Sequence, residues 1–387
     1  IKLAEDAAKI GMKWEVVHPP DWPSTERMTY VERDFNLFCN CAIADPKNPP
    51  FWYWSAYNSK SWKPKGITTI NHFGVKDPVM DELTDKLTTT NSLEEAIQLA
   101  WQIQKRDLEM CYVMPCPWGY PPINALRKDL FNATFGVVPL PNMSYAAPHT
   151  QQVGPSFFFI LNLKPVGRKF GGTYVVNKCY WVSSWNPLNW MEAPERQLFQ
   201  FMYLFLAARI VTPDGKDVVV PQLARNWTIE TWEVSPGKKG LKMTFYLFDN
   251  ITWHDGVPVT AEDIKFTLDL VKAVKPPSLS YAQIWPIYVK SIVVDPYTIE
   301  IYTNQTGIFQ FYYFIGPFFI PLPKHIWEKQ PDPYAFDNFP PIGNGPFIFE
   351  DARSHEYISV RFNPRYYLSA RRLITNVKLA ETEKVVG

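Results

Sequence analysis

The chain has 387 residues, which is enough for two or three domains. Its 39 basic and 38 acidic residues leave a formal net charge of +1, so no basic excess points to a nucleic acid or an anionic membrane as partner. No stretch reaches the roughly 18 apolar residues that a membrane-spanning helix needs. Aromatic residues make up 16% of the chain and Pro outnumbers Gly by 36 to 18, which indicates a globular protein with many stiffened loops.

The first part, residues 1–135, alternates helix and strand patterns. "LAEDAAKIG" predicts a short helix that ends at Gly11, and "NLFCNCAIA" (36–44) predicts a buried strand. Residues 45–57 read as a loop with clustered aromatic side chains. Helices are predicted from Pro78 and, after a capping box from Ser92 to Glu95, over the following turns. One face of that last helix carries Leu93, Ala96, Ile97, Ala100, Trp101 and Leu108.

A connecting segment is predicted over residues 136–171, which are rich in Pro, Ser and Gly without a clear period. The second part, 172–387, contains two hairpins, "WTIETWEV…LKMTFYLF" and "SIVVDPYTIEIYT". Between them a helix is predicted to start at Thr260, with Asp263 in its first turn. A further strand pair turns near His355. Because the chain opens on a helix followed by a strand, "IKLAEDAAKIGMKWEVV", we expect it to start downstream of a removed segment.

The stretch "NITWHDGVPVTAEDIKFTLDLV" (250–271) has two interpretations. His254 and Asp255 could be catalytic partners, or the segment could be a structural corner. Adjacent strand residues face opposite ways, so the two side chains are poorly placed to act together. No Gly-x-Ser-x-Gly, His-Glu-x-x-His or phosphate-binding loop occurs anywhere in the sequence. The structural interpretation is therefore favoured, and no catalytic residue or cofactor is predicted.

Five cysteines and five sequons bear on the compartment. Cys39, Cys41, Cys111, Cys116 and Cys179 could form a metal site, but no His lies near either close pair, so disulfides or buried thiols are favoured and no metal is predicted. The Asn-x-Ser/Thr sequons have chemical meaning only in an exported protein. Their asparagines are Asn132, Asn142, Asn226, Asn250 and Asn304. The alternative is that these are ordinary turns and strands.

An ordered set of segments over about 170–380 resembles the extracellular solute-binding proteins of family 5, the dipeptide- and oligopeptide-binding proteins of ABC importers. The segments are "GGTYVV…SSWNPLN", "VVPQLARNWTI", "LKMTFYLFDNITWHDGVPVTAEDIKFTLDLV", "VDPYTIEIYT", "PLPKHIWE" and "GNGPFIFED…YISVRFNPRYYL". The first part also resembles the family, through "LAEDAAKIGMKWEVV", "ERDFNLFCNCAIADPKNPPFWYW" and the helices that follow. These segments resemble the family's C-terminal lobe, so the family order is reversed and its middle segment is missing. A circular permutation, the joint of a tandem duplication or processing of a longer surface protein would each explain this order.

The resemblance implies an α/β fold of the type II periplasmic-binding-protein kind, partial or permuted, with two lobes that close on a ligand without catalysis. Implied partners are a peptide or oligosaccharide and an ABC transporter permease, outside the cell or at its surface. In the family an Asp near the first ligand loop often pairs with a peptide amino terminus; here the matching place is near Ile43, and Asp45 lies two residues later. Predicted ligand-binding residues are Asp45, Trp52, Tyr53, Trp54, Trp185, Asn186 and Asn344. The competing hypothesis is a self-assembling coat or filament subunit derived from this fold, associating through exposed edges.

Overall fold

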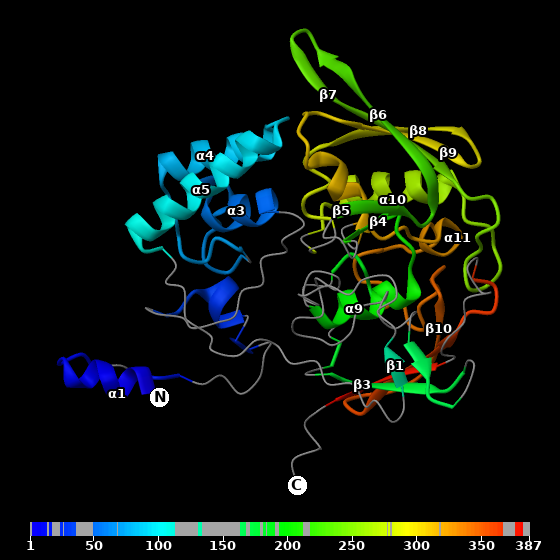
Figure 1. The fold of residues 1–387 in the computed structure, drawn as a ribbon, viewed down its shortest axis with the longest axis horizontal. Helices are drawn as coiled ribbons and strands as arrows, with labels where there is room; N and C mark the ends of the chain where they lie inside the picture. The colour runs from blue at the N-terminus through cyan, green and yellow to red at the C-terminus, as the bar shows by residue number, and fades with distance from the viewer. Residues whose placement is uncertain are drawn as a thin grey trace. The chain divides into compact units, whose positions relative to one another are not determined.

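The chain divides into two compact units in the computed structural model (Figure 1). The first comprises residues 1–44, 49–88 and 92–115, and the second comprises 45–48, 89–91 and 116–387. The predicted division into 1–135, 136–171 and 172–387 remains a prediction. The structure describes residues 2–13, 15–17, 24–25, 27–35, 49–67, 69–112, 131–133, 163–167, 171–178, 181–182, 184–189, 193–211, 217–276, 278, 281–316, 319–366 and 376–381.

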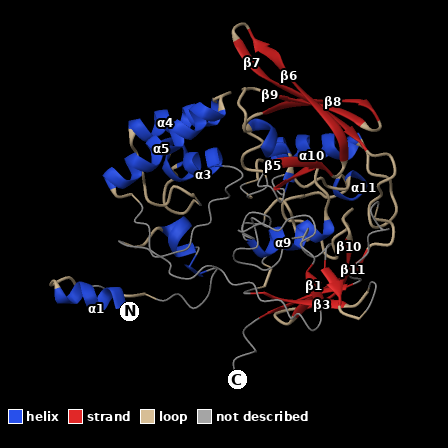
Figure 2. Cartoon of the chain, in the orientation of Figure 1, coloured by secondary structure: helices blue, strands red, loops and turns tan. Residues whose placement is uncertain are grey.

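The described residues of the first unit are helical or irregular, and none of them lies in a strand (Figure 2). The first helix ends before Gly11, whose φ of 82° is the left-handed conformation predicted for this stop. The helices are α1 (Lys2–Lys9), the π-helical turn η1 (Arg27–Glu32), α3 (Pro49–Tyr57), the 3₁₀ turn η2 (Ser59–Ser61), α4 (Pro78–Thr89) and α5 (Leu93–Met110).

Helix α3 corrects the sequence analysis, which predicted a loop over 45–57. Pro49 and Pro50 occupy its first turn, where proline costs a helix no hydrogen bond. The residues that follow are nearly all aromatic, so they show no periodic contrast between apolar and polar positions. Pattern alone could not distinguish this helix from an irregular aromatic segment.

Helix α5 starts as predicted, but its buried face shares only Ala96 with the predicted one. The Ser92 hydroxyl accepts a hydrogen bond of 3.2 Å from the Glu95 amide. The buried side chains are Ala96, Leu99 and Ile103. The predicted apolar face is largely exposed, because Leu93, Ile97, Trp101 and Leu108 are 64%, 43%, 62% and 61% accessible. The helix has two apolar stripes, and the sequence does not say which one packs inward.

The second unit contains the strands. A four-stranded sheet has the order β10-β11-β12-β3, and β12 pairs in parallel with β3. A second sheet has the order β6-β7-β9-β8 and is antiparallel throughout. The two remaining pairs are β1-β2 and β4-β5. The strands are β1 (Phe131–Ala133), β2 (Leu163–Pro165), β3 (Thr173–Lys178), β4 (Ala207–Val211), β5 (Asp217–Pro221), β6 (Ala224–Ser235), β7 (Lys238–Leu247), β8 (Tyr288–Asp295), β9 (Thr298–Thr303), β10 (Phe347–Arg353), β11 (Tyr357–Phe362) and β12 (Asn376–Glu381).

Helix α10 (Ala261–Val274) lies against the β8–β9 pair and begins as the sequence predicts. Thr260 is its N-cap, and the Thr260 amide donates to the Asp263 carboxylate at 2.9 Å. Ile264, Leu268 and Val271 are fully buried on its inner face. The predicted hairpins β6–β7 and β8–β9 and the strand pair β10–β11 are all present. The unit's other helices are α9 (Ala193–Met202), the 3₁₀ turn η3 (Gln310–Phe314) and α11 (Lys324–Trp327).

Several expectations fall outside the described residues. These are the strand over 36–44, Asp45, most of the connecting segment, and Cys39, Cys41, Cys116 and Cys179. Cys111 is a free, exposed thiol. Among the described residues, no helix is both long and apolar enough to span a membrane, and no cluster of His, Cys, Asp and Glu could hold a metal ion.

Candidate ligand-binding site

A buried histidine organises the corner that the sequence analysis singled out. The His254 amide donates to the Gly343 carbonyl at 2.7 Å, and the Gly343 amide donates to Nδ1 of the imidazole at 3.2 Å. Nε2 lies 3.1 Å from the Gly345 carbonyl, which fixes it as the protonated nitrogen. Burial lowers the pKa of His254 to about 4. The hydrogen bond to Gly345 opposes this shift, and the positive charge of Arg365 adds to it. The ring is therefore a neutral clamp on the 343–345 segment.

Gly343 and Gly345 allow the 343–345 segment to lie close to the backbone at the end of α9. A Cβ on Gly343 would lie 1.9 Å from the Met202 carbonyl oxygen, at the end of α9. A Cβ on Gly345 would lie 2.7 Å from the Met202 carbonyl carbon. Real side chains do not approach backbone atoms this closely, so this crossing requires glycine at both positions.

Asp255 has a partner other than His254. Its carboxylate lies 2.7 Å from Nε2 of His325, at the start of α11, and it also accepts from the Val257 amide. His254 and Asp255 therefore use separate partners, and the segment has the geometry of a structural corner, as the sequence analysis favoured. The His325 contact was not anticipated from the sequence, because 70 residues separate the two groups.

Trp185 belongs to an aromatic cluster in the second unit. Its ring centroid lies 5.0 Å from that of Phe339 and 5.5 Å from that of Phe349, and the two Phe rings are 5.2 Å apart. Phe339 is 48% exposed and Trp185 is half-buried. The three rings, which we call the aromatic platform, offer an apolar surface to a ligand. The sequence analysis found Trp185 but missed both phenylalanines, whose only signal is their place in "NFPPIGNGPFIF".

The asparagines beside the platform hold its loops. The Asn186 side-chain nitrogen is within hydrogen-bonding distance of the carbonyls of Pro333, Tyr334 and Phe336, and its side-chain oxygen accepts from the Leu188 amide. Asn338 likewise donates to the Trp185 carbonyl at 2.8 Å. Both amides are engaged within the chain. The ligand contact predicted for Asn186 remains untested, and in this structure its side chain positions the platform.

Asn344 lies beneath the surface. It is 1% exposed, its side-chain oxygen accepts from the Leu204 amide at 2.7 Å, and its own amide donates to the Met202 carbonyl. Its side-chain nitrogen is buried without a hydrogen-bond partner among the described residues. The ligand contact predicted for Asn344 stays a prediction.

In the first unit, Trp52, Tyr53 and Trp54 lie on α3 and are half-buried. The Trp54 indole donates to Asp85 on α4 at 2.9 Å, and the Tyr53 hydroxyl accepts from Gln104 on α5 at 3.0 Å. Because these polar groups bind within the unit, the parts of the rings that remain accessible are apolar. Stacking against a ligand stays a prediction for all three.

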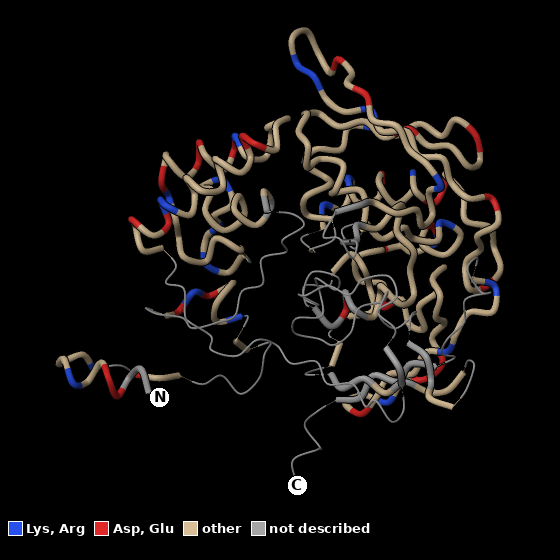
Figure 3. Tube along the Cα trace, in the orientation of Figure 1, with Lys and Arg blue, Asp and Glu red and all other residues tan. Residues whose placement is uncertain are grey.

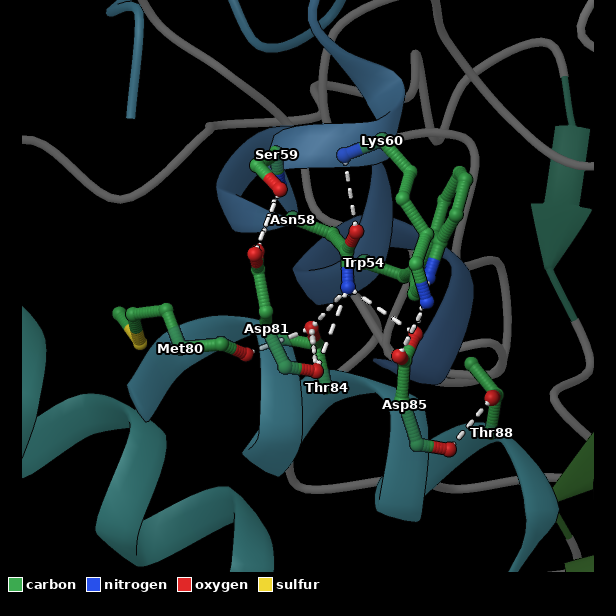
Figure 4. Close-up of polar contacts among 9 residues, drawn as sticks. All are labelled: Trp54, Asn58, Ser59, Lys60, Met80, Asp81, Thr84, Asp85 and Thr88. Atoms are coloured by element: carbon green, nitrogen blue, oxygen red, sulfur yellow. Dashed lines mark hydrogen bonds and ion pairs between the residues drawn. The ribbon is translucent and has the colours of Figure 1, made fainter. Parts of the chain in front are cut away.

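A polar network fixes the end of α3 to α4 (Figure 4). Asn58 is fully buried, and its side-chain nitrogen donates to the Thr84 hydroxyl at 2.9 Å and to Asp85 at 3.0 Å. Ser59 follows, and its amide and hydroxyl both donate to the Asp81 carboxylate. The Lys60 amide donates a hydrogen bond to the Asn58 side-chain oxygen at 3.0 Å. The network sets the orientation of the aromatic residues one turn earlier.

Comparison with known proteins bears on the second unit. Residues 218–385 match the model of the bacterial extracellular solute-binding proteins, family 5 Middle. This matched stretch, which we call the family 5 segment, is similar to that family. The family 5 segment includes the His254 corner, α10, Phe339 and Phe349, but it excludes Trp185 and the whole first unit.

Curated relatives of the chain are described as probable or putative binding proteins. It is 28% identical over 200 residues to the probable deoxycholate-binding periplasmic protein YgiS of Escherichia coli, covering 46% of this chain and 35% of that protein. It is 27% identical over 183 residues to a putative ABC transporter peptide-binding protein of Brucella abortus, covering 43% and 31%. The chain thus spans about a third of the length of the curated relatives it matches.

Two solved structures are similar to part of the chain. The oligopeptide-binding protein AppA of Bacillus subtilis, in complex with a nonapeptide, is 20% identical, with a TM-score of 0.46 over 55% of this chain and 40% of that one. NikZ of Campylobacter jejuni, in complex with Ni(L-His), is 21% identical, with a TM-score of 0.45 over 54% and 39%.

The sequon asparagines differ in accessibility. Asn226 on β6 and Asn250 in a turn are exposed. Asn304 is half-buried, and its side-chain nitrogen donates to the Pro286 carbonyl at 3.0 Å. Asn132 lies in β1, where its side chain is not described, and Asn142 lies outside the described residues.

Proposed function

We propose that this chain is part of the ligand-binding component of an ABC importer and that it binds a peptide outside the cell without catalysing a reaction. The observation that carries the proposal is the family 5 match over residues 218–385, together with curated relatives described as ABC transporter peptide-binding proteins. The neutral His254, engaged on both ring nitrogens by backbone groups, supports a role without catalysis for the Trp-His-Asp-Gly corner.

The aromatic platform supports an apolar side chain as the group that binds next to Trp185. The asparagine amides that flank the platform are engaged within the chain, so the platform presents apolar carbon and few free donors. An oligosaccharide needs hydroxyl partners in addition to a flat ring, so the peptide is the better match. Trp54, in the first unit, is proposed separately as an aromatic contact to a ligand.

The permease partner and the extracellular location follow from the same proposal. Glycosylation is proposed for Asn250, which is exposed in a turn, and stays a prediction for the other sequons, including Asn226 on β6. The coat or filament interpretation receives no support from the relatives, which are described as binding proteins, and it is not carried forward.

Calorimetry of the full chain against pools of peptides, with oligosaccharides and deoxycholate as comparison ligands, tests this proposal. We expect a peptide to bind, and we expect Trp185→Ala and Trp54→Ala each to weaken it by about 5- to 150-fold, corresponding to roughly 1–3 kcal/mol for a buried aromatic contact. Trp101→Ala is the matched control, because Trp101 is 62% exposed on α5 and should leave binding unchanged.

Two outcomes would contradict the proposal. Binding of deoxycholate or a sugar in preference to every peptide pool would change the ligand class. Peptide binding that is unaffected by both Trp54→Ala and Trp185→Ala would remove the proposed site while leaving the function in place.

A further inference from the structure

Strand β6 is a long, free sheet edge. It lies at the end of the β6-β7-β9-β8 order, so among the described strands only β7 pairs with it. It spans twelve residues, Ala224–Ser235, and most of them are exposed. Figure 1 shows the β6–β7 hairpin projecting from the rest of the second unit. The outward N–H and C=O groups of such an edge can pair with another strand.

The exposed side chains of β6 have a symmetric arrangement. Ile229, at the centre, is 45% exposed although it pairs with the fully buried Met243 of β7. Arg225 lies four residues before Ile229 and Glu233 lies four residues after it. Both are exposed. The Arg225 charge helps to lower the pKa of Asp295, after hydrogen bonds from Tyr297 and Thr298, so Arg225 already acts on one carboxylate within the described part of the chain. The Glu233 carboxylate accepts only a 3.4 Å hydrogen bond from the Gly237 amide. Figure 3 shows charges of both signs along the hairpin.

We propose that β6 pairs antiparallel with β6 of a second copy of this chain, with the two-fold axis at Ile229. Along an edge strand, the N–H and C=O groups of every second residue point outward. In a symmetric antiparallel pair, the outward groups of one copy must lie opposite the outward groups of the other. The axis therefore passes through a residue and not between two residues. With the axis at Ile229, each Ile229 faces its own copy and Asn226 faces Trp232.

This register also brings opposite charges together at both ends. Arg225 of one copy lies opposite Glu233 of the other, and the two-fold axis repeats the pair, so the interface gains two ion pairs. An axis at Glu230 places the Glu230 carboxylates of the two copies opposite each other, and like charges repel. An axis one residue before Ile229 matches no opposite charges. Charge complementarity therefore selects the Ile229 register.

Two irregularities bound the proposed interface. The pairing of β6 with β7 shifts between Ala224 and Asn226 and again between Glu233 and Ser235, so the strand is regular only over 226–233. Bulges limit how far an edge can pair. Arg225 and Glu233 therefore meet through long side chains at the ends of a short ladder. Such a small interface forms a weak, concentration-dependent dimer.

Sedimentation equilibrium of the full chain, made in a host that adds no N-linked glycans, tests the proposal. We expect the mean mass to rise from monomer towards dimer between about 10 µM and about 1 mM protein. Arg225→Glu alone and Glu233→Arg alone each turn two attractive contacts into two repulsive ones, and each should weaken the dimer about tenfold. The double variant restores opposite charges and should recover the affinity of the parent chain. Lys329→Glu, an exposed charge reversal away from β6, is the control and should have no effect.

Recovery in the double variant would support the pairing, because general effects on folding or net charge do not cancel in this way. A chain that stays monomeric over the whole range would overturn the proposal. A dimer that is insensitive to the single reversals, or one that the double variant weakens further, would place the contact elsewhere and overturn it too. Circular dichroism of each variant confirms that the hairpin is folded.

Discussion

His254 shows how a single residue couples the fold to pH. Both ring nitrogens are engaged by the 343–345 segment, and the imidazole is buried where its charged form is unfavourable. The Arg365 guanidinium donates to the His254 carbonyl, so a positive charge already lies nearby. Protonating the ring would remove the acceptor for the Gly343 amide. The corner is therefore stable only while His254 is neutral.

The second unit should lose stability as the pH falls below about 6.5. The folded pKa of His254 is lowered to about 4 from the usual 6.5, so between these values the unfolded chain binds more protons than the folded chain. The contribution is fully present above pH 6.5 and declines towards pH 4, with about 2 kcal/mol lost between pH 8 and pH 5. Urea unfolding at these two pH values measures it, and His254→Gln should reduce the dependence.

An NMR titration of the His254 ring gives an independent check. We expect no titration until the pH approaches 4. A midpoint near 6.5 would contradict the buried, neutral ring. Burial lowers the pKa of His72 in the first unit to about 4 as well, so the first unit should also lose stability as the pH falls. The urea data must therefore be taken from a probe in the second unit.

At the scale of elements, the start of α10 depends on one carboxylate. Asp263 accepts from the Thr260 amide and from the Lys324 amide, each at 2.9 Å, and so joins α10 to the first residue of α11. The residue is 5% exposed. Its neighbour Glu262 is exposed and makes only a surface ion pair with Lys324.

Asp263→Ala should therefore destabilise the second unit by about 1–3 kcal/mol, since two buried amides lose their acceptor. Glu262→Ala removes an adjacent carboxylate and should cost less than about 0.5 kcal/mol. Urea midpoints of the two variants make the comparison. Equal effects would show that the cap does not hold α10 and α11 together.

The stability of the first unit should depend in the same way on the polar network between α3 and α4. Asn58→Ala deprives the Thr84 hydroxyl and the Lys60 amide of buried partners and should destabilise this unit by about 2 kcal/mol. Lys60→Ala is the control: its ammonium forms an exposed ion pair with Asp85, which we expect to contribute little. Unfolding followed by fluorescence of the α3 tryptophans reports on this unit. A neutral Asn58→Ala would mean that packing alone orients α3.

At the scale of the whole molecule, the division into two compact units predicts two unfolding transitions. Asn58→Ala should move only the transition of the first unit, and Asp263→Ala only that of the second. Scanning calorimetry of both variants and of the double variant makes the test. If each substitution moved both transitions together, the units would form one cooperative structure.

Some elements could be predicted from sequence because local signals decide them. The Thr260–Asp263 capping box, the Ser92 cap and the Asp295-Pro296 turn between β8 and β9 act within four residues, and all are present. Helix α3 was missed because a nearly uniform aromatic run has no period, and the face of α5 was missed because both of its stripes are apolar. The aromatic platform could be predicted only in part. Trp185 stands out in the sequence, whereas Phe339 and Phe349 lie more than 150 residues away and resemble core residues.

By itself, the sequence determined the starts of α4, α5 and α10, the hairpins and the resemblance of its second part to family 5, because these depend on residues close together along the chain or on an ordered set of segments. Only the tertiary structure decided which partners the polar groups have. His254 binds the 343–345 segment, Asp255 binds His325, and Asn186 and Asn338 hold the aromatic platform. These contacts join residues 70 to 153 positions apart, and no local periodicity records such a pairing. The chemistry of the site is therefore a property of how the elements pack.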